Sequence, residues 1–149
     1  MMTVHAALID VVSVAFDTAP LIYFVERNPT RVDLMRTILQ RVDRGELIGY
    51  TSTITLTEVL AQPLRTGNTE LQIRYRTLLL SSANFNTVVI DRFIAEAGAD
   101  IRARYGLRTP DALQIATGIV LGCDAFITND RAHTRVTELK VIVLDELTL

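Results

Sequence analysis

Four acidic residues are the part of this sequence best suited to chemistry, because each stands beside the end of an expected strand or the start of an expected helix. They are Asp17, Glu58, Asp111 and Asp130. Asp17 follows the apolar run 11–16. Asp130 comes shortly after the apolar run 125–128. Ligands of open parallel sheets bind beside the carboxyl ends of the strands. Carboxylates gathered there repel one another unless a divalent cation joins them, so the sequence predicts an oxygen-ligand site for a hard metal ion.

The elements that must position these acids alternate along the chain. Expected strands are 11–16, 47–52, 86–90, 125–128 and 140–144. Expected helices run from Thr18 to about Asn28, over 30–44, from Thr55 to Pro63, and over 70–80, 92–105 and 110–121. Strands alternating with helices indicate a parallel sheet covered by helices. We therefore expect one three-layer α/β/α domain over 1–149, with about five mainly parallel strands and a ragged extension at 1–10.

The direction of the chain brings the acids together. If strand 125–128 is parallel to strand 11–16, the helix before it must begin at the carboxyl edge of the sheet. Asp111 opens that helix and therefore belongs at the same edge as Asp17 and Asp130. Glu58 joins them because its helix starts just after strand 47–52. Asp124 precedes its strand and is expected at the opposite edge.

Each acid also has a purely structural explanation. Asp17 and Asp130 could cap the segments that follow them, and Asp111 sits in a first helical turn, where the macrodipole favours an anion. Thr55-Leu56-Thr57-Glu58 matches a capping box. Capping explains the positions one by one but not their gathering on one edge, so a shared site is the preferred interpretation. The two histidines, His5 and His133, stand isolated and show no metal-binding spacing.

Composition excludes several other classes of protein. The net charge of −2 gives no broad positive field of the kind that marks many nucleic-acid-binding proteins. This weakens a nucleic-acid interpretation without excluding it, because four clustered acids mask basic surface elsewhere in the total. A single cysteine, Cys123, rules out an internal disulfide and a cysteine-based zinc cluster. No apolar run approaches the length of a membrane span, and no secretory signal begins the chain, so we expect a cytoplasmic protein without membrane contact. Nucleophile-elbow and glycine-rich phosphate-loop motifs are missing from the sequence.

Four segments together resemble the PIN-domain ribonucleases, and most closely the VapC-type toxins of toxin–antitoxin pairs. They are Val-Ala-Phe-Asp-Thr at 14–18, Ser-Thr-Ile-Thr-Leu-Thr-Glu at 52–58, Leu-Arg-Thr-Pro-Asp-Ala-Leu-Gln-Ile-Ala-Thr at 107–117, and Phe-Ile-Thr-Asn-Asp at 126–130. The segments run in order along nearly the whole chain beyond the first ten or so residues. The third and fourth are the specific ones; the first two would be weak alone.

The resemblance implies an endoribonuclease that hydrolyses RNA with Mg²⁺ or Mn²⁺ at an acidic quartet. By this likeness the quartet is Asp17, Glu58, Asp111 and Asp130, with Asp17, Asp111 and Asp130 as metal ligands and Glu58 as an outer ligand or a group that orients water. Thr128 matches the small hydroxyl position beside the last acid and is expected, with Arg108, to contact substrate. Family membership further implies a homodimer and a small antitoxin protein that masks the site.

Other interpretations stay open at this point. The chain could be a PIN nuclease that is no toxin and acts on DNA or RNA, or a catalytically silent PIN-like scaffold that binds a partner.

Two other folds with acids at strand ends lack a residue that they require. A phosphatase of the HAD type needs a second aspartate two residues after Asp17, where Ala19 stands. A receiver domain needs a lysine late in a strand, whereas the only lysine, Lys140, begins one.

Overall fold

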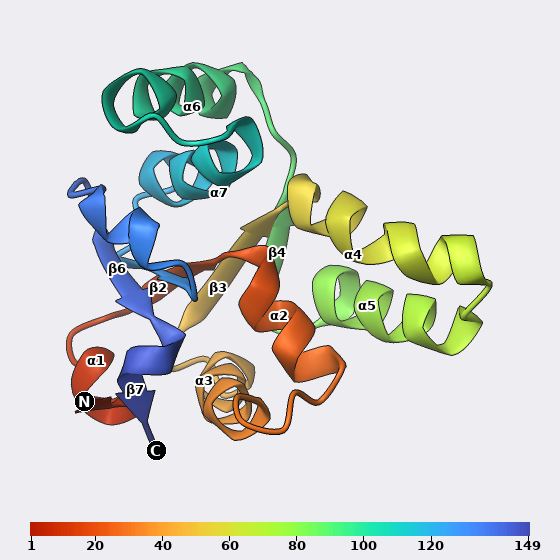
Figure 1. The fold of residues 1–149 in the computed structure, drawn as a ribbon. Helices are drawn as coiled ribbons and strands as arrows, with labels where there is room; N and C mark the ends of the chain where they lie inside the picture. The colour runs from red at the N-terminus through yellow and green to blue at the C-terminus, as the bar shows by residue number, and fades with distance from the viewer.

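A parallel sheet of five strands forms the centre of the molecule in the computed structural model, which describes residues 1–149 (Figure 1). The strands are β2 (Ser13–Phe16), β3 (Ile48–Ser52), β4 (Phe85–Val88), β5 (Ala125–Thr128) and β6 (Lys140–Val143), in the spatial order β4-β3-β2-β5-β6. All four neighbouring pairs are parallel. The α/β class and the parallel five-stranded sheet predicted from the sequence are thus confirmed.

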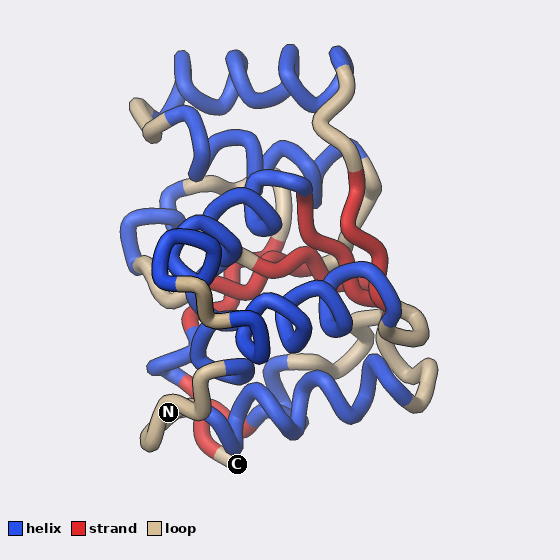
Figure 2. The backbone as a smooth tube through the Cα atoms, turned by 90° about the vertical axis from the view of Figure 1, so that its right-hand side faces the viewer, coloured by secondary structure: helices blue, strands red, loops and turns tan.

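Helices cover both faces of the sheet, which gives the predicted three layers (Figures 1 and 2). They are α2 (Thr18–Val25), α3 (Val32–Asp43), α4 (Thr53–Thr66), α5 (Thr69–Ser81), α6 (Arg92–Tyr105) and α7 (Thr109–Val120). Helices α2 and α3 lie below the sheet in Figure 1, α6 and α7 lie above it, and the α4–α5 hairpin projects to one side. Helix α6 packs closely on α7 because Gly98 leaves room: a Cβ atom there would lie 2.8 Å from Leu113 Cδ2.

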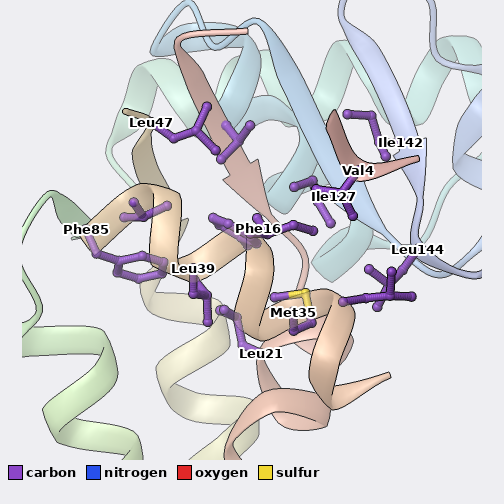
Figure 3. Packing of buried hydrophobic residues seen from close by; sticks show 14 of the residues in the cluster. Val4, Phe16, Leu21, Met35, Leu39, Leu47, Phe85, Ile127, Ile142 and Leu144 are labelled. Atoms are coloured by element: carbon purple, nitrogen blue, oxygen red, sulfur yellow. The ribbon is translucent and has the colours of Figure 1, made fainter. Parts of the chain in front are cut away.

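The central strands are buried on both faces, and their side chains alternate between two cores. Val14 and Phe16 of β2 join a large cluster with residues of α2, α3 and α5, part of which is drawn in Figure 3. Ala15, between them, packs instead with Phe126 and Ile115 under α6 and α7. This burial on both faces explains why the strands read as continuous apolar runs rather than as alternating ones.

The first ten residues differ from the ragged extension that we expected. Met2–Thr3 form strand β1, which pairs in parallel with β7 (Leu147–Thr148) close to the C-terminus (Figure 1). The single helical turn α1 (Val4–Ala7) then buries Val4, Ala7 and the following Leu8 in the large core. The segment is ordered because it adds apolar side chains to that core, and two-residue strands leave no periodic signal in a sequence.

Helix α4 begins earlier and ends later than predicted. Its N-cap is Ser52, whose hydroxyl accepts from the amide of Ile54, so Thr55 is a helical residue and the predicted Thr55–Glu58 capping box is wrong. Pro63 lies inside the helix and is buried there rather than ending it. The helix ends at Gly67 in the left-handed conformation (φ 70°), which glycine adopts without steric cost.

Candidate active site

Asp17 stands at the carboxyl end of β2 and caps helix α2. Its Oδ1 accepts from the amide of Thr18 at 2.9 Å, and its Oδ2 accepts from the hydroxyl of Thr128 at 2.7 Å. Burial raises the pKa of the Asp17 carboxyl above its ordinary value, and the nearby charge of Asp111 raises it further, against the lowering effect of these hydrogen bonds. The two hydrogen bonds therefore do not fully replace the water that an ionised carboxylate would have.

Asp111 and Asp130 reach the same place from two other elements. Asp111 lies in the first turn of α7, and Asp130 follows β5 and caps the short 3₁₀ helix η1 (Arg131–Arg135). Asp130 Oδ1 accepts from the amide of Ala132 at 2.9 Å. The expected gathering of Asp17, Asp111 and Asp130 at the carboxyl edge is therefore present in the structure.

A histidine occupies the centre of this group. His133, on η1, is only 1% exposed and lies among all three aspartates. Its Nδ1 is 3.7 Å from Asp17 Oδ2, and its Nε2 is 3.8 Å from Asp111 Oδ2 and 3.5 Å from Asp130 Oδ2. The expectation that His133 is isolated in a loop is wrong, because η1 folds it back from the end of β5 onto the acids.

Sequence reasoning missed His133, although a signal was available. Asp130 and His133 are three residues apart on a segment that Asp130 itself caps, and residues three apart lie on one side of a 3₁₀ helix. A short Asp-x-x-His stretch after the last strand was therefore enough to suggest that both side chains face the same site.

Glu58 joins the site through a hydroxyl rather than by direct contact. The Oγ1 of Thr18, the residue after Asp17, donates to Glu58 Oε1 at 2.8 Å. Glu58 is solvent-exposed on α4, and the three aspartates, not Glu58, surround the imidazole. Three members of the predicted quartet, the aspartates, thus surround His133. The fourth, Glu58, is linked to them through the hydroxyl of Thr18.

Behind Glu58 lies a buried polar network centred on Gln114. The Gln114 amide nitrogen donates to Thr18 Oγ1 at 3.0 Å and to Thr55 Oγ1 at 2.6 Å, while its carbonyl oxygen accepts from Ser52 Oγ at 2.6 Å. Gln114 is 2% exposed and links α7 with α2 and α4. The network fixes the Thr18 hydroxyl that holds Glu58, a role that the sequence analysis did not assign to Gln114.

The two residues predicted to contact substrate border the acids in different ways. Thr128 is fully buried and holds Asp17, and its hydroxyl also accepts from the amide of Asp130 at 3.1 Å. Arg108 is 82% exposed at the side chain, and its Nε lies 3.3 Å from Asp111 Oδ2. Thr128 is therefore placed to orient carboxylates, whereas Arg108 is free to reach a group in solution.

The donor atoms at this edge suit a hard divalent cation. Carboxylate oxygens from three elements face one small region, and a buried ring nitrogen, His133 Nε2, has no hydrogen-bond partner. No three histidine, cysteine or acidic side chains are arranged as a ready-made metal site. The three aspartates surround the imidazole instead. The chemistry of the donor set fits Mg²⁺ or Mn²⁺, with bound waters completing the coordination.

Comparison with known protein families matches residues 14–139 to the PIN domain. Among solved structures, the chain is similar to VapBC2 of Rickettsia felis bound to a promoter DNA fragment (TM-score 0.73, 14% identity, 89% of this chain and 98% of that chain). It is also similar to a toxin–antitoxin complex of Klebsiella pneumoniae (TM-score 0.66, 25% identity, 88% of this chain and 97% of that chain). A further similar structure is VapBC-1 of Haemophilus influenzae (TM-score 0.64, 20% identity, 90% of this chain and 99% of that chain). No match was found among curated proteins.

Proposed function

Because this chain belongs to the PIN domain family, whose members are generally nucleases, we propose that it is a metal-dependent endoribonuclease and the toxin of a toxin–antitoxin pair. The observation that carries the proposal is the convergence of Asp17, Asp111 and Asp130 around one buried imidazole at the carboxyl edge of the sheet. The similarity over most of its length to structures of VapBC and of a toxin–antitoxin complex supports the toxin assignment.

In this proposal Asp17, Asp111 and Asp130 hold one or two Mg²⁺ or Mn²⁺ ions. Such an ion, when bound, lowers the pKa of a coordinated water and offsets the charge that develops on the scissile phosphate. Thr128 keeps Asp17 Oδ2 in place by its 2.7 Å hydrogen bond. Glu58, held by Thr18, orients the attacking water and accepts its proton.

The substrate contact that we propose is Arg108. Its guanidinium is beside Asp111 and mostly exposed, so it can grip a phosphate with two parallel hydrogen bonds. Two other arginines are held by acids: Arg104 pairs with Asp100 and Glu138, and Arg74 pairs with Glu70. Aromatic residues make up only 6% of the chain and none is tryptophan, so we propose that the protein contacts the RNA backbone rather than stacking bases on aromatic side chains.

A groove away from the acids supports the proposal of an antitoxin partner. It has a volume of about 510 Å³ and lies among α2, α3 and α5. Phe24, Val32 and Leu78 line it together with Arg27, Arg36 and Arg74, of which Arg36 and Arg74 also pair with Asp33 and Glu70. A partner segment with apolar residues on one face and acidic residues beside them would fit this lining.

We also propose that two copies associate. Val89 and Phe93, at the connection between β4 and α6, are 71% and 60% exposed. Large apolar side chains left in water favour burial against a second surface.

None of the helices combines the length and apolar character needed to cross a bilayer. We propose that the protein acts in the cytoplasm, where its proposed RNA substrate is found.

The experiment that tests this function is cleavage of total RNA and transfer RNA by the purified protein freed of any co-purified partner. Mg²⁺, Mn²⁺ and chelator are compared, beside Asp17→Asn and a matched control, Asp33→Asn, which changes an exposed aspartate on α3. We expect metal-dependent cutting by the wild type and by Asp33→Asn, and none by Asp17→Asn. Cutting of single-stranded DNA but not RNA would contradict the ribonuclease assignment, and cutting by Asp17→Asn would contradict the site.

A further inference from the structure

His133 Nε2 is the only buried side-chain nitrogen or oxygen atom in the protein that has no hydrogen-bond partner. Polar atoms in protein interiors are nearly always paired, so an unpaired one calls for a specific explanation. The ring packs near that of Phe126, and the two ring centroids are 6.3 Å apart. Its Nε2 is therefore fixed in position by packing while facing two carboxylates.

The hydrogen bonds around Thr128 fix the orientation of the His133 ring. The Thr128 hydroxyl has one proton, and it donates this proton to Asp17 Oδ2 at 2.7 Å. The same oxygen lies 3.3 Å from His133 Nδ1, so at that contact Thr128 can only accept and Nδ1 must donate. Nδ1 is thus committed to Thr128, and Nε2 is the ring nitrogen that faces the acids without a hydrogen bond.

Nε2 faces negative charge from two elements. Nε2 lies 3.5 Å from Asp130 Oδ2 at the start of η1 and 3.8 Å from Asp111 Oδ2 on α7. Two carboxylates that converge on one nitrogen attract a cation, and a metal ion there would be held by the nitrogen as well as by the oxygens. The opposite nitrogen is already held by a hydroxyl that is itself bonded to a carboxylate, which is how metal-binding histidines are commonly oriented.

We propose that His133 Nε2 is a direct ligand of the metal ion, together with the aspartates, so that the site is a mixed nitrogen–oxygen centre. This inference rests on the metal site of the proposed function and specifies its chemistry. Mg²⁺ prefers oxygen ligands and dehydrates reluctantly, whereas transition-metal ions accept imidazole readily. The site should therefore bind Mn²⁺ more tightly than Mg²⁺.

The test uses Mn²⁺ as the probe, because its unpaired electrons report coupled nitrogen nuclei in pulsed electron paramagnetic resonance. The chain has two histidines, so labelling histidine with ¹⁵N and changing His5 to Ala leaves His133 as the only labelled residue. We expect a ¹⁴N modulation from directly bound imidazole that becomes a ¹⁵N modulation in the labelled His5→Ala protein. This readout needs neither RNA cleavage nor a change at His133.

A substitution then measures what the nitrogen contributes. His133→Asn keeps a donor near the Nδ1 position and removes Nε2, so the bond to Thr128 can persist. By calorimetric titration we expect Mn²⁺ affinity to fall about 10–100-fold, the range typical of strong ligand-shell changes, with a smaller loss for Mg²⁺. The His5→Ala protein should bind both ions as the wild type does.

The outcomes separate this inference from the proposed function. If Mn²⁺ binds, Asp17→Asn abolishes that binding and no histidine nitrogen is coupled, the inference is overturned while the metal site stands. If neither ion binds at millimolar concentration and RNA is not cut, both are overturned. A histidine coupling that survives in His133→Asn and disappears in His5→Ala would also refute the assignment.

Discussion

The two ends of strand β5 each carry an aspartate, and the two aspartates are in opposite circumstances. Asp124, before the strand, uses one oxygen to accept from the amides of Val12 and Ser13 at 2.8 and 3.1 Å. Asp130, after the strand, has one oxygen on the amide of Ala132 and the other turned towards His133 Nε2, which has no partner. An acid whose oxygens accept hydrogen bonds from backbone amides stabilises the fold. Acids that converge on a nitrogen without a hydrogen-bond partner form a site for a cation.

The largest expected effect comes from removing the charge of Asp111 at the carboxyl edge of the sheet, compared with the same change to Asp124 at the opposite edge. Asp111→Asn should reduce metal-dependent RNA cleavage by about 100-fold or more, at the upper end of losses seen when metal-ligand shells are altered. Asp124→Asn should retain the wild-type rate, because its remaining oxygen can still accept from the two amides. Rates measured side by side, with folding checked by circular dichroism, test the contrast; similar losses in both variants would remove it.

The next effect concerns the hydroxyl that links Asp17 to His133. Thr128→Val keeps the shape of the buried side chain and removes the hydrogen bond to Asp17, so cleavage should fall about 10-fold. Thr128→Ser keeps the hydroxyl and is the matched control, with a rate close to that of the wild type. A Val variant as active as the Ser variant would show that the hydroxyl plays no part in orienting the site.

At the opposite edge we expect an effect on stability and none on catalysis. Asp124→Ala leaves the amides of Val12 and Ser13 without their acceptor, which should lower the free energy of unfolding by about 1 kcal/mol. Urea denaturation measures this change, and the cleavage rate of the folded variant should be unaltered. A cleavage defect in this variant at a temperature where it is fully folded would speak against the division between the two edges.

The smallest effect concerns Asp145, an acid that has a cation as its partner. Arg31 holds it by two hydrogen bonds of 2.7 and 2.8 Å and lowers the pKa of Asp145 to about 2, whereas burial raises the pKa of Asp17. A folded-state pKa below the unfolded value stabilises the protein above the unfolded pKa, and this contribution is lost as the pH falls from about 4 towards 2. Because the pair is partly exposed, its contribution should stay below about 1 kcal/mol.

Asp145→Asn should therefore remove a small part of the stability at pH 7 and almost none at pH 2. The measurement is the difference in free energy of unfolding between variant and wild type at pH 7, 4 and 2. A difference that grows as the pH falls would contradict the assigned direction of the pKa shift.

The positions of the acids could be predicted because chain direction in a parallel sheet fixes the edge at which each helix begins. This reasoning placed Asp111 beside Asp17 and put Asp124 on the far side, and the periodic helix at 92–105 was predicted with its observed ends. The position of His133 could not be predicted in the same way, because a five-residue 3₁₀ helix has no hydrophobic period. The polar network of Gln114 joins three helices, and such contacts are visible only once the helices are packed.

The acids at the carboxyl edge of the sheet are unsatisfied without a cation. Thermal unfolding of the wild type, Asp17→Asn and Asp33→Asn, with chelator and with Mn²⁺, tests this most directly. We expect Mn²⁺ to raise the Tm of the wild type and of Asp33→Asn. Since burial disfavours the charged form of Asp17, Asp17→Asn should be at least as stable as the wild type in chelator, and Mn²⁺ should leave its Tm unchanged. If Mn²⁺ does not change the Tm of the wild type and Asp17→Asn is destabilised, this interpretation is contradicted. Asp17 would then be a structural helix cap.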